Sequence, residues 1–277
     1  MPFDGLRVLS LESRRAAEIE RLIRTQGGVP MVAPSMREVP LMDNPQAFDF
    51  AAKLLGGEVE MVIFLTGVGA RLLNQTLETR YPSGAIVEAL KQVVTVARGS
   101  KPATALREWG VPITVMVPEP NTWREILKAT ESRHERRIFI QEYGRPATEL
   151  TEGLRTRGAQ VTSVPVYQWA LPIDTDPLRK AAHGIAQGQF DVLLLTAAIQ
   201  VEHLLQVASS EGIEPELRRA LPRMVVASVG PTTSETLSEL GIAVDFEPSH
   251  PKMGFLVTET AQRAGDILKS KREQPKA

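Results

Sequence analysis

A strand–turn–helix unit occurs twice in this chain, far apart and with the same internal spacing. The first copy spans residues 93–111 and the second spans residues 224–242. In each copy an apolar run ends at a glycine, Gly99 or Gly230, and a short helical pattern follows that a second glycine closes. A glycine turn into a helix leaves backbone N–H groups unpaired, which favours anion binding. The repeat predicts two similar lobes facing one acidic ligand. Reuse of the unit for packing alone explains the repeat equally well.

A second similarity between the two halves of the sequence supports two lobes. The segment Val62–Gly69 matches Val192–Ile199, and in each half this threonine-ended strand comes before the glycine-turn unit. Strand patterns alternate with helix patterns along the whole chain, which predicts an α/β fold with two parallel sheets. Outside the two copies, the predicted strands are 6–11, 29–33, 60–66, 112–117, 137–141, 160–167, 191–196 and 243–247. The predicted helices are 16–26, 47–55, 70–79, 84–91, 121–130, 148–157, 174–188, 201–209 and 253 to about 268.

Two proline-containing, extended stretches, 39–45 and 169–174, are candidate crossings between the lobes. If both are crossings, the second lobe is inserted into the first. Lobe one is then 1–38 with 172–277, lobe two is 40–168, and the linkers are about 39–45 and 168–173.

Composition excludes several classes of protein and of site. The 277 residues carry a formal net charge of -1, so no bulk attraction to nucleic acid is indicated. The absence of cysteine excludes disulfides, thiolate catalysis and cysteine-ligated metal sites. The four histidines show no ligand spacing, and we expect no metal. We find neither a signal peptide nor an apolar run that could cross a bilayer, and we expect a cytoplasmic monomer without a membrane partner.

With these motifs in place, the chain resembles the uroporphyrinogen-III synthase family. The resemblance rests on the order of weak motifs over nearly the whole length: the strand ends at Thr66 and Thr196, the turn Gly230–Thr233, the strand ending in Val166–Tyr167, and the closing segment Pro248–Gly254. It implies two α/β lobes joined by a pair of extended strands, with the active site in the cleft between them, and neither a metal nor an organic cofactor.

The resemblance also implies an activity. The enzyme would be a cofactor-free hydro-lyase that takes hydroxymethylbilane, a linear tetrapyrrole polycarboxylate. It would remove water, invert the terminal ring and close the macrocycle to uroporphyrinogen III in tetrapyrrole (heme, siroheme or cobalamin) biosynthesis. Loss of the hydroxyl needs a proton donor, ring inversion needs a shaped site, and the carboxylates need N–H, hydroxyl and cationic partners.

Tyr167 is the candidate catalytic residue, because the family carries a tyrosine here that is thought to assist departure of the hydroxyl. The competing interpretation is packing at a lobe junction. The candidate substrate-binding residues stand at strand ends and glycine turns, where helix capping or a solvated surface explains the same residue types. They are Thr66, Gly67, Arg98, Ser100, Lys101, Arg145, Thr196, Ala197, Gly230, Thr232 and Thr233.

The chain departs from the family pattern in ways that reduce its hydroxyl donors. Thr66-Gly67 and Thr196-Ala197 stand where the family often has Thr-Ser, and Pro102 replaces a threonine in the first glycine turn. We therefore expect Gly230–Thr233 to contribute more to ligand binding than the turn of the first copy. The alternative function is that of a non-catalytic relative that binds a tetrapyrrole or another polyanion in a regulatory role.

Overall fold

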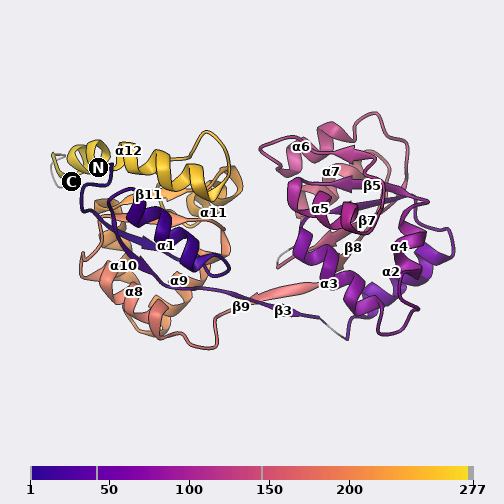
Figure 1. Cartoon of the computed structure of the whole chain (residues 1–277), viewed down its shortest axis with the longest axis horizontal. Coiled ribbons are helices and arrows are strands. Elements are labelled where there is room, and N and C mark those ends of the chain that lie inside the picture. The colour runs from indigo at the N-terminus through magenta and orange to yellow at the C-terminus, as the bar shows by residue number, and fades with distance from the viewer. Residues whose placement is uncertain (1, 42, 145, 274–277) are drawn as a thin grey trace. The chain divides into compact units, whose positions relative to one another are not determined.

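The computed structural model describes residues 2–41, 43–144 and 146–273. The chain forms two compact units, Met1–Arg37 with Ala170–Ala277, and Glu38–Trp169 (Figure 1). Each unit contains one parallel sheet with helices on both faces, so the predicted α/β class with two parallel sheets is confirmed. The strands β3 (Arg37–Pro40) and β9 (Tyr167–Ala170), where the chain passes between the units, pair with each other as a two-stranded sheet.

The first unit is built on a four-stranded sheet in the order β11-β10-β1-β2, with every neighbouring pair parallel. Its strands are β1 (Arg7–Ser10), β2 (Val29–Val32), β10 (Val192–Leu195) and β11 (Val225–Ser228). Its helices are α1 (Ala16–Thr25), α8 (Asp176–Ala186), α9 (Ile199–Ser210), α10 (Glu214–Ala220), α11 (Pro231–Glu239) and α12 (Met253–Glu273), with a 3₁₀ turn at Leu221–Arg223.

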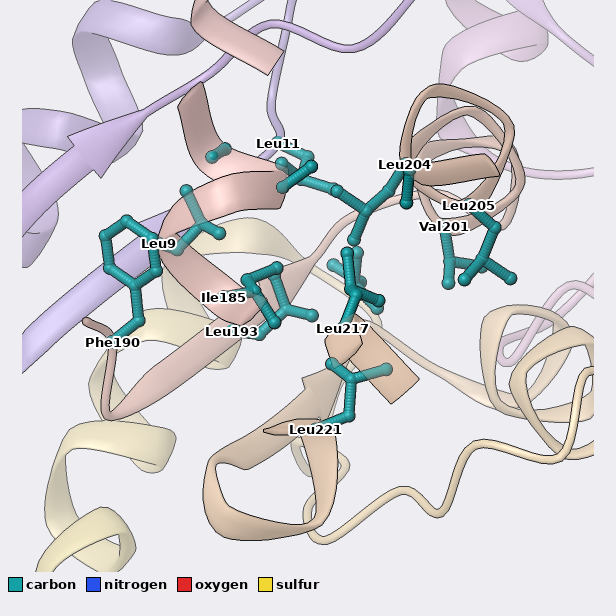
Figure 2. Close-up of a cluster of buried hydrophobic side chains, with 14 of the residues drawn as sticks. Leu9, Leu11, Ile185, Phe190, Leu193, Val201, Leu204, Leu205, Leu217 and Leu221 are labelled. Atoms are coloured by element: carbon teal, nitrogen blue, oxygen red, sulfur yellow. The ribbon is translucent and has the colours of Figure 1, made fainter. Parts of the chain in front are cut away.

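Alternating side chains divide between the two faces of this sheet, as period-two geometry requires. Leu9 and Leu193 pack with α8, α9 and α10 on one face, where aliphatic side chains from these elements gather (Figure 2). Val8 and Val192, their chain neighbours, pack with α1 and α12 on the other face. Burial on both faces explains why β10 is apolar throughout, a pattern typical of a central parallel strand.

The second unit has a five-stranded parallel sheet in the order β6-β5-β4-β7-β8. Its strands are β4 (Met61–Phe64), β5 (Val94–Ala97), β6 (Val115–Met116), β7 (Arg137–Glu142) and β8 (Gln160–Pro165). Its helices are α2 (Pro45–Leu55), α3 (Gly67–Leu77), α4 (Ala85–Leu90), α5 (Ser100–Glu108), α6 (Trp123–Ala129) and α7 (Thr148–Thr156). Phe64 packs on the face covered by α2 to α5, whereas Ile63 packs on the face covered by α6 and α7.

A buried or half-buried carboxylate secures the amino edge of each sheet. Asp191, just before β10, accepts from the N–H of Arg7 at 2.9 Å and from its Nε at 3.0 Å. Burial raises the pKa of Asp191, but the hydrogen bonds from Arg7 outweigh it and leave that pKa below its ordinary value. Glu60, just before β4, accepts from the N–H groups of Arg136 at 2.6 Å and Arg137 at 2.9 Å. These bonds lower the pKa of Glu60 to about 2.

The predicted strands were wrong in three places, and one helix was missed. The strand predicted over 160–167 is two strands, because β8 ends at Pro165 and Tyr167 opens β9. The strand predicted over 112–117 contains only Val115–Met116. The strand predicted over 243–247 is a single bridge from Phe246 to Ala227. There the Asp245 carboxylate takes the N–H of Val226 at 2.8 Å, in place of a backbone carbonyl. Helix α10 was missed, because its short charged sequence shows little apolar periodicity.

Candidate functional site

In the second unit, Thr66 stands at the carboxyl end of β4 and caps helix α3. Its hydroxyl accepts from the N–H of Gly69 at 2.9 Å, which satisfies one of the free donors of the first helical turn. Its own N–H donates to Oε1 of Gln141, on the neighbouring strand β7, at 3.2 Å. Both backbone and side chain of Thr66 are therefore engaged within the unit, as the capping interpretation predicts.

Gly67 and Gly69 allow two close approaches at the same strand end. A Cβ on Gly67 would lie 2.5 Å from the backbone oxygen of Lys101, at the start of α5. A Cβ on Gly69 would lie 2.1 Å from Nε2 of Gln141. Packing thus accounts for a glycine at position 67, where the resemblance implied a serine, and the close approach brings the first turns of α3 and α5 together.

In the first unit, Thr196 occupies the matching position after β10, and its surroundings are also filled. Its N–H donates to Oε1 of Gln200 at 2.8 Å, and the N–H of Ala197 reaches the same oxygen at 3.3 Å. The Thr196 hydroxyl donates to the carboxylate of Glu12, which also accepts from the N–H groups of Arg14 and Arg15 at 2.9 and 3.1 Å. Thr196 therefore already binds a carboxylate of the chain itself.

The Gly230 turn of the second copy is closed by two serines. The N–H of Gly230, predicted to be free, donates to Oγ of Ser228 at 3.1 Å, and that oxygen lies 2.7 Å from Oγ of Ser234. Pro231 has no N–H, and Thr233 is buried and donates its N–H to the Gly230 carbonyl at 3.0 Å. Thr232 is exposed, and its N–H has no acceptor among residues 2–41, 43–144 and 146–273.

The Gly99 turn of the first copy has the same backbone shape without the serines. Gly99 has φ 167° and ψ −170°, Gly230 has φ 161° and ψ −177°, and both are extended residues that precede their helices. Buried Ala97 and Ala103 stand where Ser228 and Ser234 stand in the second copy. Within the described part of the chain, the N–H groups of Gly99 and of exposed Ser100 meet no acceptor. This turn therefore presents two backbone donors at the start of α5, with Lys101 exposed beside them.

Arg98 immediately precedes this turn, and Tyr143 holds its guanidinium. Arg98 Nη1 donates to the phenol oxygen of Tyr143 at 2.5 Å, and its Cζ lies 4.8 Å from the centre of the tyrosine ring. The ring of Trp169 meets the ring of Tyr143 edge-on at 5.4 Å. The ring of Tyr167 lies 6.5 Å from that of Tyr143. An arginine and three aromatic side chains thus gather near the carboxyl end of this sheet.

Comparison with known proteins decides the family. A family model described as uroporphyrinogen-III synthase HemD matches residues 17–258. The chain belongs to the uroporphyrinogen-III synthase family. A mutant uroporphyrinogen III synthase from the extremely thermophilic bacterium Thermus thermophilus has a similar structure, with a TM-score of 0.70 and 25% identity over 95% of this chain and 99% of that one. The synthase from Helicobacter pylori 26695 shares the fold at a TM-score of 0.53 and 17% identity, over 95% of this chain and 99% of that one.

A sequence relative is known as well. The chain is 28% identical over 265 residues to a Bacillus subtilis (strain 168) protein called "Uncharacterized protein YjjA", an alignment that covers 93% of this chain and 96% of that protein. Its name assigns no activity, so the family assignment rests on the family model.

The predicted residues of this uroporphyrinogen-III synthase family member divide between the units. Tyr167 is 2% exposed and belongs to the apolar core of the second unit. Arg145 lies outside the described residues. The second unit also holds Thr66, Gly67, Arg98, Ser100 and Lys101, and the first unit holds Thr196, Ala197, Gly230, Thr232 and Thr233.

Sequence reasoning missed the residues that complete these surroundings, namely Glu12, Gln141, Tyr143, Gln200, Ser228 and Ser234. Gln141 ends a predicted strand and Gln200 stands four residues after Thr196, so both spacings were visible. Only the fold shows that the side-chain amide oxygen of each glutamine accepts a hydrogen bond from a threonine N–H. Among the described residues, no cluster of three or more His, Asp or Glu side chains is arranged to hold a metal ion, and no helix has the length and apolarity to span a bilayer.

Proposed function

We propose that this chain is a uroporphyrinogen-III synthase that dehydrates hydroxymethylbilane, inverts its terminal ring and closes the macrocycle. The observation that carries the proposal is the family match over residues 17–258. The reaction is redox-neutral. The terminal C–O bond breaks, water leaves with one added proton, and the resulting cation forms a spiro C–C bond at the substituted α-carbon of the terminal ring. The older C–C bond at that carbon then breaks, a second C–C bond closes the macrocycle at the ring's free α-carbon, and a proton returns to solvent.

We assign the proton donor for the departing hydroxyl to Tyr167. Its phenol is the family's candidate acid, and its ring packs among apolar residues of the second unit. Burial of the acid suits a reaction that passes through a conjugated cation, because bulk water would trap that cation before the ring closes.

The carboxylates of the substrate need donors, and the two copies of the turn supply unequal sets. The Gly99 turn offers the N–H groups of Gly99 and Ser100, with the cations Arg98 and Lys101 beside them. The Gly230 turn offers the N–H and hydroxyl of Thr232. We therefore assign the stronger carboxylate site to the Gly99 turn, since it combines open backbone donors with positive charge.

Kinetics of Tyr167→Phe test this function. The unaltered protein should consume freshly prepared hydroxymethylbilane faster than it cyclises spontaneously. The Phe variant should close the ring about 10²–10⁴-fold more slowly, the usual cost of losing a general acid. Tyr81→Phe is the matched control, since the Tyr81 hydroxyl makes one bond, to the Phe48 carbonyl at 3.4 Å, in the same unit. If Tyr167→Phe is as fast as the unaltered protein, the acid assignment is wrong.

One observation favours a second candidate, a non-catalytic binder of tetrapyrroles or other polyanions. Tyr167 is 2% exposed and lies in the apolar core of the second unit, as its packing interpretation predicts. A binder would take up uroporphyrin, the oxidised macrocycle that keeps all the carboxylates, without accelerating consumption of hydroxymethylbilane. The synthase would do both.

A further inference from the structure

Arg98 differs in its partner from three other arginines of the second unit. Arg71, Arg133 and Arg137 each form an ion pair with a carboxylate. Arg98 is half-buried and hydrogen-bonds a neutral phenol, and no carboxylate lies within ion-pair distance of it in the described part of the chain. Its orientation is therefore fixed while its positive charge stays uncompensated, an arrangement suited to an incoming carboxylate.

Tyr143 fixes that orientation across a strand. Arg98 follows β5 and Tyr143 follows β7, and β4 lies between these strands in the sheet. The hydrogen bond of 2.5 Å between Arg98 Nη1 and the Tyr143 phenol oxygen thus crosses the carboxyl end of β4, the end at which Thr66 stands. The ring under the guanidinium adds a second restraint, with Cζ 4.8 Å from its centre.

Tyr143 is itself held from behind by Trp169. The two rings meet edge-on at 74°, with centres 5.4 Å apart. Gly144 lets the indole approach this closely, because a Cβ there would lie 2.3 Å from Cε3 of Trp169. Gly144 also has a φ of +64°, which glycine adopts readily, and its N–H donates to the Tyr167 carbonyl at 3.1 Å. The phenol is thereby anchored to the backbone that carries the proposed acid.

We propose that Tyr143 is a positioning residue that sets the Arg98 guanidinium to receive a carboxylate of the tetrapyrrole. The identity of the ligand rests on the proposed function, whereas the geometry of the pair does not. Tyr143 acts through Arg98, and its effect is to increase ligand affinity.

Titration of uroporphyrin III, followed by its fluorescence, tests the inference without turnover. Tyr143→Phe keeps the ring and removes the bond, and we expect about fivefold weaker binding, the effect of one hydrogen bond of about 1 kcal/mol. Tyr81→Phe removes a comparable hydroxyl from the same unit and should leave binding unchanged. Unchanged binding in Tyr143→Phe overturns the inference.

A double-mutant cycle separates positioning from a structural role. If Tyr143 acts through Arg98, Tyr143→Phe has no further effect on binding in an Arg98→Met background. An equal fivefold loss in both backgrounds overturns the inference. Arg98→Lys provides a second route should Tyr143→Phe fold poorly, because lysine keeps the charge but lacks the planar fork. It should lose about as much affinity as Tyr143→Phe, and full affinity in Arg98→Lys contradicts the inference.

Steady-state kinetics with hydroxymethylbilane give the remaining readout. Positioning of a binding group predicts that Tyr143→Phe raises KM and leaves kcat unchanged. A fall in kcat at constant KM would make Tyr143 a proton donor and overturn the positioning role. The two proposals also fail separately: uroporphyrin binding that depends on Tyr143 in a protein without turnover rejects the synthase and keeps the inference.

Discussion

The backbone N–H of Gly230 donates to Oγ of Ser228 at 3.1 Å, and alanine at the matching position, Ala97, denies this bond to Gly99. Because the two glycines share an extended backbone, this one side chain decides whether the turn keeps a free donor. The repeat seen in the sequence is thus the same backbone motif twice. The glycine N–H donates to a serine hydroxyl in the first unit, where the turn is closed, whereas alanine replaces that serine in the second unit, where the turn is open.

Replacing Ser228 by alanine should destabilise the first unit by about 1–2 kcal/mol, because it leaves the buried N–H of Gly230 and the hydroxyl of Ser234 without their shared partner. Scanning calorimetry measures the change. Ser238→Ala is the control and should be neutral, since Ser238 is an exposed serine on α11, the helix that carries Ser234. Equal melting temperatures for both variants would show that the serine bond contributes nothing.

Transplanting the serine into the other copy should close the open turn. In Ala97→Ser the new hydroxyl is placed to accept from the N–H of Gly99, which removes a donor from the ligand. We expect about fivefold weaker uroporphyrin binding in a fluorescence titration. Ala105→Ser adds a hydroxyl to another buried alanine of the same core and should not weaken binding. Undiminished affinity in Ala97→Ser would remove the Gly99 turn from the binding site.

Introducing a serine after Thr66, as the family pattern suggests, should destabilise the second unit. In Gly67→Ser the new Cβ meets the backbone oxygen of Lys101, so α3 and α5 must separate, at about 1–3 kcal/mol. Ala197→Ser makes the equivalent change in the first unit, where alanine already provides the Cβ, and we expect it to be tolerated. Calorimetry of the two variants compares them, and a fully stable Gly67→Ser would mean that the helices adjust freely.

Acid should weaken the second unit through Glu60. Its pKa is about 2 in the folded protein against an ordinary 4.5. A lowered pKa means that the unfolded chain takes up the proton first, so this stabilisation is complete above pH 4.5 and disappears as the pH falls toward 2. The stability difference between the unaltered protein and Glu60→Gln should shrink over that range.

Urea unfolding at several pH values measures this difference. All three tryptophans, Trp109, Trp123 and Trp169, lie in the second unit, so their fluorescence reports its unfolding. Exposed Glu58 provides the control variant, Glu58→Gln. A difference between the unaltered protein and Glu60→Gln that stays constant down to about pH 2 would contradict the shifted pKa.

The elements that bury the most apolar surface were the most predictable from the sequence. The run at 191–196 predicted a buried strand, and Val192–Leu195 is buried throughout. Segments whose pairing depends on one polar side chain were not predictable, as at 243–247, where the Asp245 carboxylate interrupts the ladder. Periodicity reports burial, and it carries no information about which donor a carboxylate finds.

The positions of the candidate residues at strand ends and turns were predictable, because the carboxyl ends of parallel strands share one edge of each sheet. Their assignment to substrate binding stays a prediction. It was not predictable which backbone donors would be taken by side chains of the chain itself. The sequence favoured the Gly230 turn for its threonines, yet Ser228 occupies the Gly230 N–H there, while Ala97 leaves the Gly99 N–H open. The contact between Tyr143 and Arg98 was equally hidden, since the two residues follow strands that β4 separates in the sheet.

The isomer composition of the product tests the central proposal most directly. Hydroxymethylbilane is incubated with the purified, unaltered protein, the macrocycle is oxidised, and the isomers are separated chromatographically. We predict that the type III isomer, which requires inversion of the terminal ring, predominates and forms faster than spontaneous closure. Formation of the type I isomer alone, at the rate seen without protein, would contradict the assignment of this chain as a uroporphyrinogen-III synthase.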